Sequence, residues 1–324
     1  MFSIAEFDAA ARLIAPHVPP TPQYAWPLLA EALGVETWVK HENHTPTGAF
    51  KVRGGLVFVE RLKRERPEIR GLVSATRGNH GQSLAFAARA HGLSATIVVP
   101  HGNSPEKNAA MRAFGAELIE HGRDFDEAKA HAATLAAGAD RLFVPSFAPE
   151  LVLGVGTYGV ELFRAVPDLD VVFCPIGLGS GACGLIAAKA ALGRSVEIVG
   201  VVSTRADAYK RSLEGPALVE TTTPADTFAD GMAVRCPSPD ALAMMRTGLS
   251  RIVAVDDAAI ADAARLLFTA THNAAEGAGA AALAALSAEH ERWRGRRAAV
   301  VLTGGNIDRP WFAALLAGTT PTVA

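Results

Sequence analysis

The chain of 324 residues is 49% hydrophobic and 20% charged, with a formal net charge of −2. This length and composition allow a sizeable globular core, and the small net charge gives no reason to expect nucleic acid or an anionic membrane as a partner. No apolar run reaches the length of a membrane span, and the acidic N-terminal segment is unlike a signal peptide. With three cysteines that share no metal-type spacing, these features predict a cytoplasmic protein.

Short apolar runs rich in β-branched residues alternate with alanine-rich amphipathic stretches, which predicts an α/β protein with a parallel sheet. The predicted strands are 37–40, 71–74, 95–99, 116–119, 142–144, 171–175, 197–202 and 298–302, and the helices between them include 83–91, 107–114 and 258–270. Residues 211–224 and 236–239 are expected to be irregular. Two prolines and three closely spaced glycines interrupt the pattern near residues 145–155, which predicts the break between two lobes there.

Lys51 ends the segment Thr47-Gly48-Ala49-Phe50-Lys51, in which its neighbours are small or aromatic. Burial among such residues lowers the pKa of an amine and makes it nucleophilic toward an aldehyde. The alternative is an ordinary solvated lysine, and this segment alone does not separate the two.

A polar turn, Arg77-Gly78-Asn79-His80-Gly81-Gln82, lies between a predicted strand and a predicted helix. A glycine-bounded turn at a helix N-terminus presents free backbone N–H groups to an anion. Asn79 and His80 add side-chain donors for a carboxylate or a phenolic oxygen. The alternative is a simple turn in which Asn79 caps the helix.

A second turn, residues 177–184 with the sequence GLGSGACG, joins a strand to a helix and is expected to bind a phosphate group. Gly179, Gly181 and Gly184 also match the dinucleotide fingerprint, so a nicotinamide-dependent oxidoreductase is an alternative. That function needs an acidic residue after the next strand, where Arg205 stands instead. Arg205 keeps an NADP-dependent form of this alternative open.

Two later segments carry further candidates. Thr303-Gly304-Gly305-Asn306 follows a late strand, and Glu276 precedes a small-residue helix that it is expected to cap. His41 and His44 have no third ligand at a suitable spacing, so no metal site is predicted.

In this order the segments resemble the fold-type II pyridoxal-phosphate (PLP) enzymes, and within them the serine/threonine dehydratases. The resemblance runs from about Thr21 to Asp308 and includes KHENHTPTGAFKVRGG, TRGNHGQSLAFAA, GLGSGACG, TFADGMAV, EGAGAAALAAL and LTGGNID. It implies two open, twisted, mostly parallel sheets flanked by helices. Residues 1–70 and 149–324 would form a large PLP-binding domain, residues 71–148 a small mobile domain, and the assembly a homodimer.

The resemblance also implies roles for single residues. Lys51 would hold PLP as a Schiff base and later remove the substrate α-proton. The other cofactor contacts would be Phe50 against the ring, Asn79 on the ring oxygen, Thr303 facing the pyridine nitrogen, and Gly177, Leu178, Gly179, Ser180 and Gly181 around the phosphate. Thr76, Arg77, Asn79 and His80 would border the site of the substrate carboxylate.

The implied reaction is elimination of water from a β-hydroxy-α-amino acid, giving a 2-oxo acid and ammonia. L-Threonine, L-serine and bulkier substrates of the phenylserine or hydroxyaspartate type are all open, and a PLP-dependent β-replacement synthase is the alternative. Serine racemases have a serine where this chain has Arg77, so racemisation is not expected. Arg77 is expected to contact an anionic part of substrate or cofactor, or to form a salt bridge.

Overall fold

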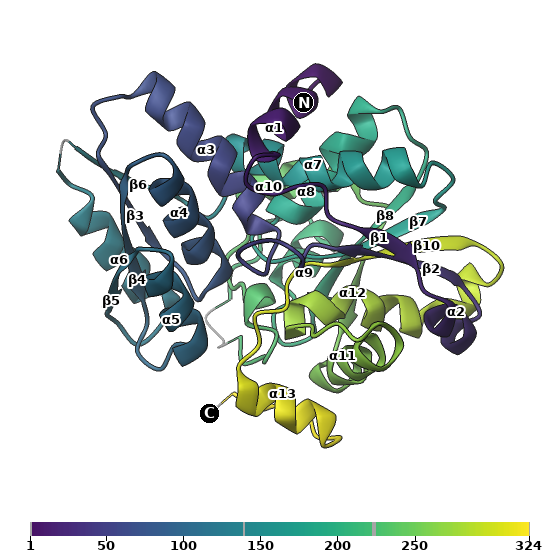
Figure 1. The fold of residues 1–324 in the computed structure, drawn as a ribbon. Helices are drawn as coiled ribbons and strands as arrows, with labels where there is room; N and C mark the ends of the chain where they lie inside the picture. Colours follow the sequence, from purple (N-terminus) through teal and green to yellow (C-terminus); the bar gives the residue numbers. More distant parts are fainter. Residues whose placement is uncertain (1, 139, 222–224, 324) are drawn as a thin grey trace.

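The computed structural model describes residues 2–138, 140–221 and 225–323. In this part of the chain the strands form two sheets with helices on both faces of each (Figure 1). The larger sheet has the order β1 (Gln23–Ala25), β2 (Glu36–His41), β10 (Arg297–Leu302), β7 (Val171–Pro175), β8 (Glu197–Ser203) and β9 (Arg251–Val255). All its neighbouring strands are parallel except β1 and β2.

The smaller sheet has the order β5 (Glu117–Glu120), β4 (Ser94–Val99), β3 (Gly71–Ala75) and β6 (Arg141–Phe143), and all its pairs are parallel. It is flanked by α4 (Asn79–Ala90), α5 (Pro105–Ala113) and α6 (Phe125–Leu135). We call residues 71–143 the small lobe and the larger sheet with its helices the large lobe. The predicted domain boundaries at 70/71 and 148/149, and the mobility of the smaller domain, stay predictions.

The helices of the large lobe cover both faces of its sheet. They are α1 (Ile4–Ile14), α2 (Pro27–Leu33), α3 (Lys51–Glu65), α7 (Pro149–Ala165), α8 (Ser180–Ala191), α9 (Ala208–Glu214), α10 (Pro239–Gly248), α11 (Asp257–Thr271), α12 (Gly277–Ala288) and α13 (Arg309–Leu316), with the 3-10 helices η1 (Asp230–Met232) and η2 (His290–Trp293). Figure 1 shows α7 and α8 on one face of the sheet and α11 and α12 on the other. Each face has its own apolar core, because α7 and α8 contribute to one cluster of buried residues and α11 and α12 to another.

The glycines expected to interrupt the chain near residues 145–155 do not do so, because α7 runs without interruption from Pro149 to Ala165. Its glycines are sites of close helix packing. A Cβ on Gly154 would lie 2.4 Å from the backbone oxygen of Arg53, and one on Gly156 would lie 2.9 Å from that of Gly184. The expectation for residues 211–224 is also partly wrong, since α9 reaches Glu214. Residues 222–224 lie outside the described ranges.

The described helices include none that is long and apolar enough to cross a membrane.

Candidate active site

Lys51 begins α3, and the segment before it is fixed to the end of the central strand β10. The Phe50 N–H donates to the backbone oxygen of Thr303 at 3.0 Å, and Ala49 forms a β-bridge with Gly304. The Lys51 amine donates to the Ser180 hydroxyl at 3.2 Å. Three predicted site segments that are far apart in sequence are therefore joined at Lys51 and the two residues before it.

The surroundings of the Lys51 amine make it a better nucleophile than an ordinary lysine. The residue keeps partial solvent access, yet burial of its amine lowers its pKa to about 8, against the opposing charge of Glu276. The amine also lies 5.0 Å from the centre of the Phe50 ring. A larger fraction of this amine than of an ordinary lysine is therefore uncharged near neutral pH, and condensation with an aldehyde and later proton removal both require the uncharged form.

The predicted phosphate loop passes from β7 to the N-terminus of α8 and has room only for glycine at two points. Gly179 has a φ of +105°, and a Cβ on Gly177 would lie 2.4 Å from the backbone oxygen of Gly231. The loop is fixed by two tyrosine hydroxyls, which donate to the backbone oxygens of Leu178 and Gly181. Among the described residues no side chain caps α8, so its first N–H groups are available to an anion.

Asn79 begins α4 but does not cap it, contrary to the simpler interpretation of its turn. Its Nδ2 donates to Glu276 Oε1 at 2.6 Å, and its Oδ1 accepts from Asn306 Nδ2 at 2.8 Å. A carboxamide has two N–H donors, so one is left for a ligand such as a ring oxygen. Helix α4 packs directly against the start of α3, since the Ser83 hydroxyl donates to the backbone oxygen of Lys51 at 2.7 Å.

Thr76 and His80, the buried residues predicted to border the substrate site, differ in their hydrogen bonding and are both uncharged. Thr76 is buried and its hydroxyl accepts from the Gly78 N–H at 3.0 Å. Burial, and then the charge of Lys51, lower the pKa of His80 to about 3, so its ring is neutral. In the part of the chain that the structure describes, His80 Nε2 has no hydrogen-bond partner. An anionic carboxylate would therefore be bound here by backbone N–H groups rather than by a charged imidazole.

Arg77 is exposed, and within the described ranges no hydrogen bond or ion pair of its side chain is present. The salt bridge considered for it from the sequence is therefore absent from these residues, and a role toward an anionic ligand stays a prediction. Arg205, the residue that kept the NADP alternative open, lies 3.8 Å from the carboxylate of Asp257. The described residues hold no group of three or more His, Cys, Asp or Glu that could bind a metal ion.

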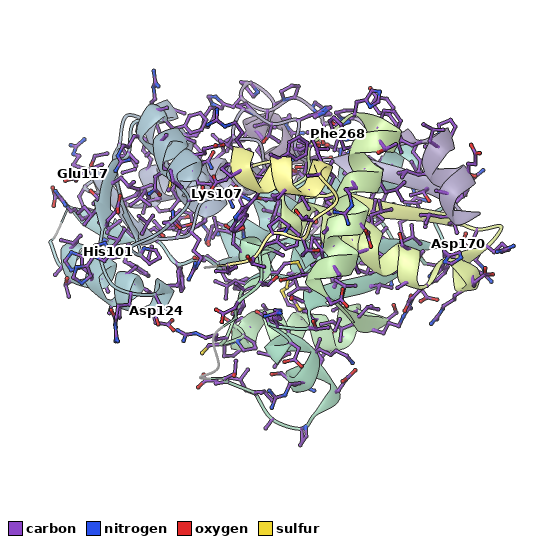
Figure 2. The ribbon with its side chains drawn as sticks, turned by 90° about the horizontal axis from the view of Figure 1, so that it is seen from below. His101, Lys107, Glu117, Asp124, Asp170 and Phe268 are labelled. Atoms are coloured by element: carbon purple, nitrogen blue, oxygen red, sulfur yellow. The ribbon has the colours of Figure 1, made fainter. Side chains whose placement is uncertain are left out.

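Glu276 is a site residue whose role the sequence did not indicate. It was expected to cap α12, but its side chain makes no capping hydrogen bond and instead reaches Asn79 across the site. Lys107 Nζ lies 3.3 Å from Glu276 Oε2 and 2.6 Å from Asp230 Oδ2. A signal for this cluster existed, since a lone acid occurs in each of the small-residue segments AEGAGA and TFADGM. Figure 2 shows Lys107 at the side of the small lobe that faces the large lobe, away from Glu117.

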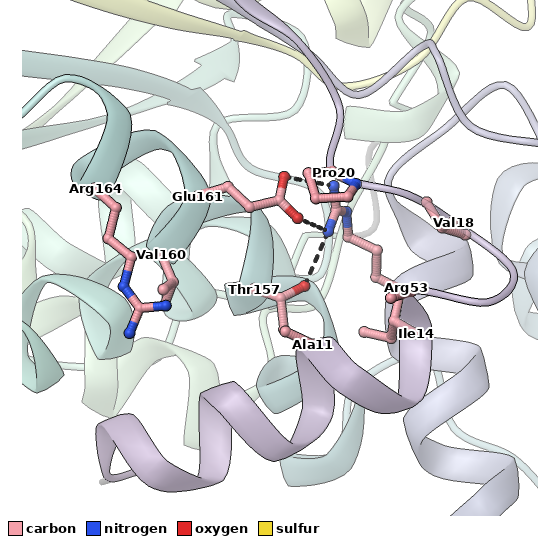
Figure 3. Close-up of a pocket in the computed structure, with 10 residues that line it drawn as sticks. Ala11, Ile14, Val18, Pro20, Arg53, Thr157, Val160, Glu161 and Arg164 are labelled. Atoms are coloured by element: carbon pink, nitrogen blue, oxygen red, sulfur yellow. Dashed lines mark hydrogen bonds and ion pairs between the residues drawn. The ribbon is translucent and has the colours of Figure 1, made fainter.

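A buried ion network anchors α3 just after Lys51. Arg53, which is only 1% exposed, donates to both carboxylate oxygens of Glu42 and both of Glu161. Lys40 Nζ lies 2.6 Å from Glu161 Oε2. Arg53 and Glu161 line a cavity of about 180 Å³ between α1 and α7. Figure 3 shows these two side chains paired at its edge. None of the predicted cofactor or substrate residues lines this cavity. The network therefore acts on the site indirectly, by fixing the helix that begins at Lys51.

These residues fit PLP by their chemistry: an enclosed amine of lowered pKa, an uncapped helix N-terminus for a phosphate, and a carboxamide with a spare N–H. Comparison with known proteins agrees. A family model described as "Pyridoxal-phosphate dependent enzyme" matches residues 14–304. An L-threonine ammonia-lyase of Geobacter sulfurreducens is 36% identical over 280 residues, 86% of this chain and 69% of that protein.

Two further matches cover nearly the whole of both chains. An L-threo-3-hydroxyaspartate ammonia-lyase of Pseudomonas sp is 31% identical over 92% of this chain and 93% of that protein. The solved structure of a T.th. threonine deaminase is 33% identical, with a TM-score of 0.88 over 95% of this chain and 99% of that chain. The fold-type II architecture and the PLP cofactor expected from the sequence are thereby confirmed. The chain belongs to the family of pyridoxal-phosphate dependent enzymes.

Proposed function

We propose that the protein is a lyase that removes water from a β-hydroxy-α-amino acid and releases a 2-oxo acid and ammonia. The observation that carries this proposal is the Lys51 amine, which lies 3.2 Å from the Ser180 hydroxyl at the N-terminus of α8 and has a lowered pKa. The relatives named as threonine and hydroxyaspartate ammonia-lyases support the same reaction class.

In this proposal, groups of the chain bind the substrate and remove its α-proton, and the cofactor supplies the electron withdrawal. When bound at Lys51, PLP would supply the electron withdrawal that makes the substrate α-proton acidic. The uncharged Lys51 amine takes the α-proton, and backbone N–H groups in the first turn of α4 bind the substrate carboxylate. The Cβ–O bond breaks and the hydroxyl takes up one proton as it leaves, so the α-proton and the hydroxyl are together lost as one molecule of water. The enamine that remains is hydrolysed to the 2-oxo acid and ammonia.

Thr303 favours elimination over transamination in this proposal. A hydroxyl facing the pyridine nitrogen does not hold that nitrogen protonated as an aspartate would, so the ring withdraws electrons more mildly. Thr303 is buried and adjoins the Lys51 segment through the bond from the Phe50 N–H. L-Threonine, L-serine and bulkier 3-hydroxy amino acids are all candidate substrates.

The visible absorption of the purified protein tests the cofactor, and release of 2-oxo acid from a panel of β-hydroxy amino acids tests the reaction. We expect a visible band that borohydride abolishes and that is absent in Lys51→Ala. Lys129→Ala is the matched control, because Lys129 is exposed on α6. A colourless protein, or activity that survives Lys51→Ala, would contradict the proposal. Capture of an added thiol in place of oxo-acid release would favour the β-replacement alternative.

The homodimer and the cytoplasmic location expected from the sequence stay predictions. Light scattering of the purified protein measures the first, and fractionation of the source cells measures the second.

A further inference from the structure

Lys107 is an unusual buried cation at the junction of the two lobes. It lies on α5 of the small lobe, and its side chain is 8% exposed. Its ammonium lies 2.6 Å from Asp230 Oδ2 and 3.3 Å from Glu276 Oε2, and both acids belong to the large lobe. Burial alone would lower the pKa of Lys107, but the two carboxylates outweigh burial and raise it, so the amine is charged.

The aliphatic part of the Lys107 side chain is also closely packed. A Cβ on Gly78 would lie 2.5 Å from Lys107 Cδ, so the stem passes directly over the residue that precedes Asn79. On the other side, Asp230 belongs to η1, and the backbone oxygen of the next residue, Gly231, abuts the phosphate loop at Gly177. Lys107 therefore joins the α4 turn to the segment beneath the phosphate loop.

Glu276 connects this cluster to the groups proposed to hold the cofactor. Its Oε1 accepts from Asn79 Nδ2 at 2.6 Å, while its Oε2 faces Lys107. Asn306 Nδ2 donates to Asn79 Oδ1, so Asn79 is held from both ends of its carboxamide and has one N–H free. The orientation of that free N–H depends on Glu276 keeping its place.

We propose that Lys107 is a positioning residue, which reaches from the small lobe to Asp230 and Glu276 and holds Glu276 against the Asn79 carboxamide. Asn79 then presents its remaining N–H to the cofactor ring. The inference rests on the proposed function, since it assumes PLP at Lys51. Lys107 does not touch the reacting atoms itself.

The charges around Glu276 determine what removal of Lys107 does. Glu276 is faced by Lys107 from α5, Asp230 from η1, Asn79 from α4 and Lys51 from α3. Burial raises the pKa of Glu276, and Lys107 opposes that rise. Without Lys107, Glu276 would take up a proton more readily, and the negative charge that favours a protonated nitrogen at Lys51 would weaken.

The test uses the holoenzyme and three substitutions: Lys107→Met, which removes the charge but keeps the stem, Lys107→Arg, which keeps a charge, and Glu276→Gln. For each we would titrate the visible absorption of bound PLP with pH and measure the dissociation constant of PLP. Lys107→Met should raise that constant by about 10- to 100-fold, the range for losing one hydrogen bond to a charged group, here the bond proposed from Asn79 to the cofactor ring. It should also shift the absorption titration to lower pH, and Lys107→Arg should restore part of both.

Two controls separate positioning from simple attachment of the lobes. Arg235 also joins the lobes, through Asp124 at 3.2 Å and through Asp126, but at the rim. Arg235→Met should leave the absorption titration unchanged. In the Glu276→Gln background, Lys107→Met should cause no further shift, because the coupling passes through Glu276.

The outcomes distinguish this inference from the proposed function. A wild-type protein without a visible band would overturn the proposed function itself. A normal wild-type band with an unchanged Lys107→Met titration would overturn the inference alone. Equal shifts in Arg235→Met, or a full Lys107→Met shift in the Glu276→Gln background, would do the same.

Discussion

Replacing Arg53 with methionine should destabilise the protein more than almost any other single change of a charged residue. Arg53 is two residues after Lys51 on α3, and its side chain is buried among Glu42, Glu161 and two threonine hydroxyls, which accept at 3.1 and 3.2 Å. Methionine fills much of the same volume without the charge, so the main effect is electrostatic.

The magnitude follows from what the substitution leaves behind. Glu42 and Glu161 would remain with Lys40 as their nearby cation, at 4.0 and 2.6 Å. Two carboxylates would then share one ammonium in a buried site. Removing one partner of a buried ion pair costs about 3–5 kcal/mol, because it leaves an uncompensated charge away from water. Against a total stability of about 5–15 kcal/mol, that loss is severe.

Urea unfolding followed by circular dichroism would measure the change in the free energy of unfolding. The matched control is Arg61→Met on the same helix, because Arg61 is 48% exposed and pairs with Glu65 and Glu150 at the surface. Its cost should be within about 1 kcal/mol. If Arg53→Met cost no more than Arg61→Met, the network would not hold α3 in place and the reasoning would be refuted.

Acid pH gives an independent check of the same network. Burial alone would raise the pKa of Glu161, but the charges of Arg53 and Lys40 outweigh it and lower this pKa from its ordinary value of 4.5. A lowered folded-state pKa contributes stability that is complete above 4.5 and is lost as the pH falls below it. The stability difference between wild type and Arg53→Met should therefore shrink below that pH.

Three other predictions concern the site and the thiols. Gly179→Ala should lower the free energy of unfolding by about 1–3 kcal/mol, because Gly179 has a positive φ and the added Cβ would lie 2.7 Å from Met245 Cε. In Gly181→Ala the added Cβ would meet no atom of the described residues nearer than 3.5 Å, so this variant should fold normally. The rate at which PLP develops its visible band on apoprotein should rise with pH through about 8, because burial lowers the pKa of Lys51 to that value. A thiol reagent should modify only Cys236 in the native protein, because the other two cysteines are buried and burial raises their pKa to about 12.

Each of these has a clear contrary result. Equal stability of the two glycine variants in urea would remove the argument for a strained loop. A PLP reaction profile that rises only near pH 10 would mean that the Lys51 amine is solvated like a free lysine. Rapid reaction of more than one thiol per native chain would show that the core around the phosphate loop opens readily.

The sequence predicted the buried strands well because their apolar runs end at clear breakers. The predicted range 171–175 coincides with β7, all of whose residues are buried. The edge strands β1 and β9 were not predicted, since β1 has only three residues, two of them exposed, and β9 is only partly buried. The glycines of α7 were misjudged as a break because their cause, the contact with Arg53 and Gly184, lies in other helices.

The same limit applies to the site. The Lys51 segment and the phosphate loop have local sequence features, and the structure brings Lys51 and Ser180 together. Asn79 and Glu276 are separated by 197 positions, and Glu276 looks locally like a helix cap. Only the tertiary fold, which brings the starts of α4 and α12 together, makes it a partner of Asn79. The roles of the individual site residues stay predictions until they are substituted.

The place of β10 in the larger sheet has a consequence for biosynthesis. This strand is near the C-terminal end, yet it lies between β2 and β7 and pairs with both. Ribosomes add about 5–20 residues per second, so β10 is synthesised on the order of tens of seconds after β2 and Lys51. The small lobe is continuous in sequence and can fold during that interval. The unpaired edges of β2 and β7 are what a chaperone would have to shield, and a chain that ended before β10 would have no centre to its larger sheet.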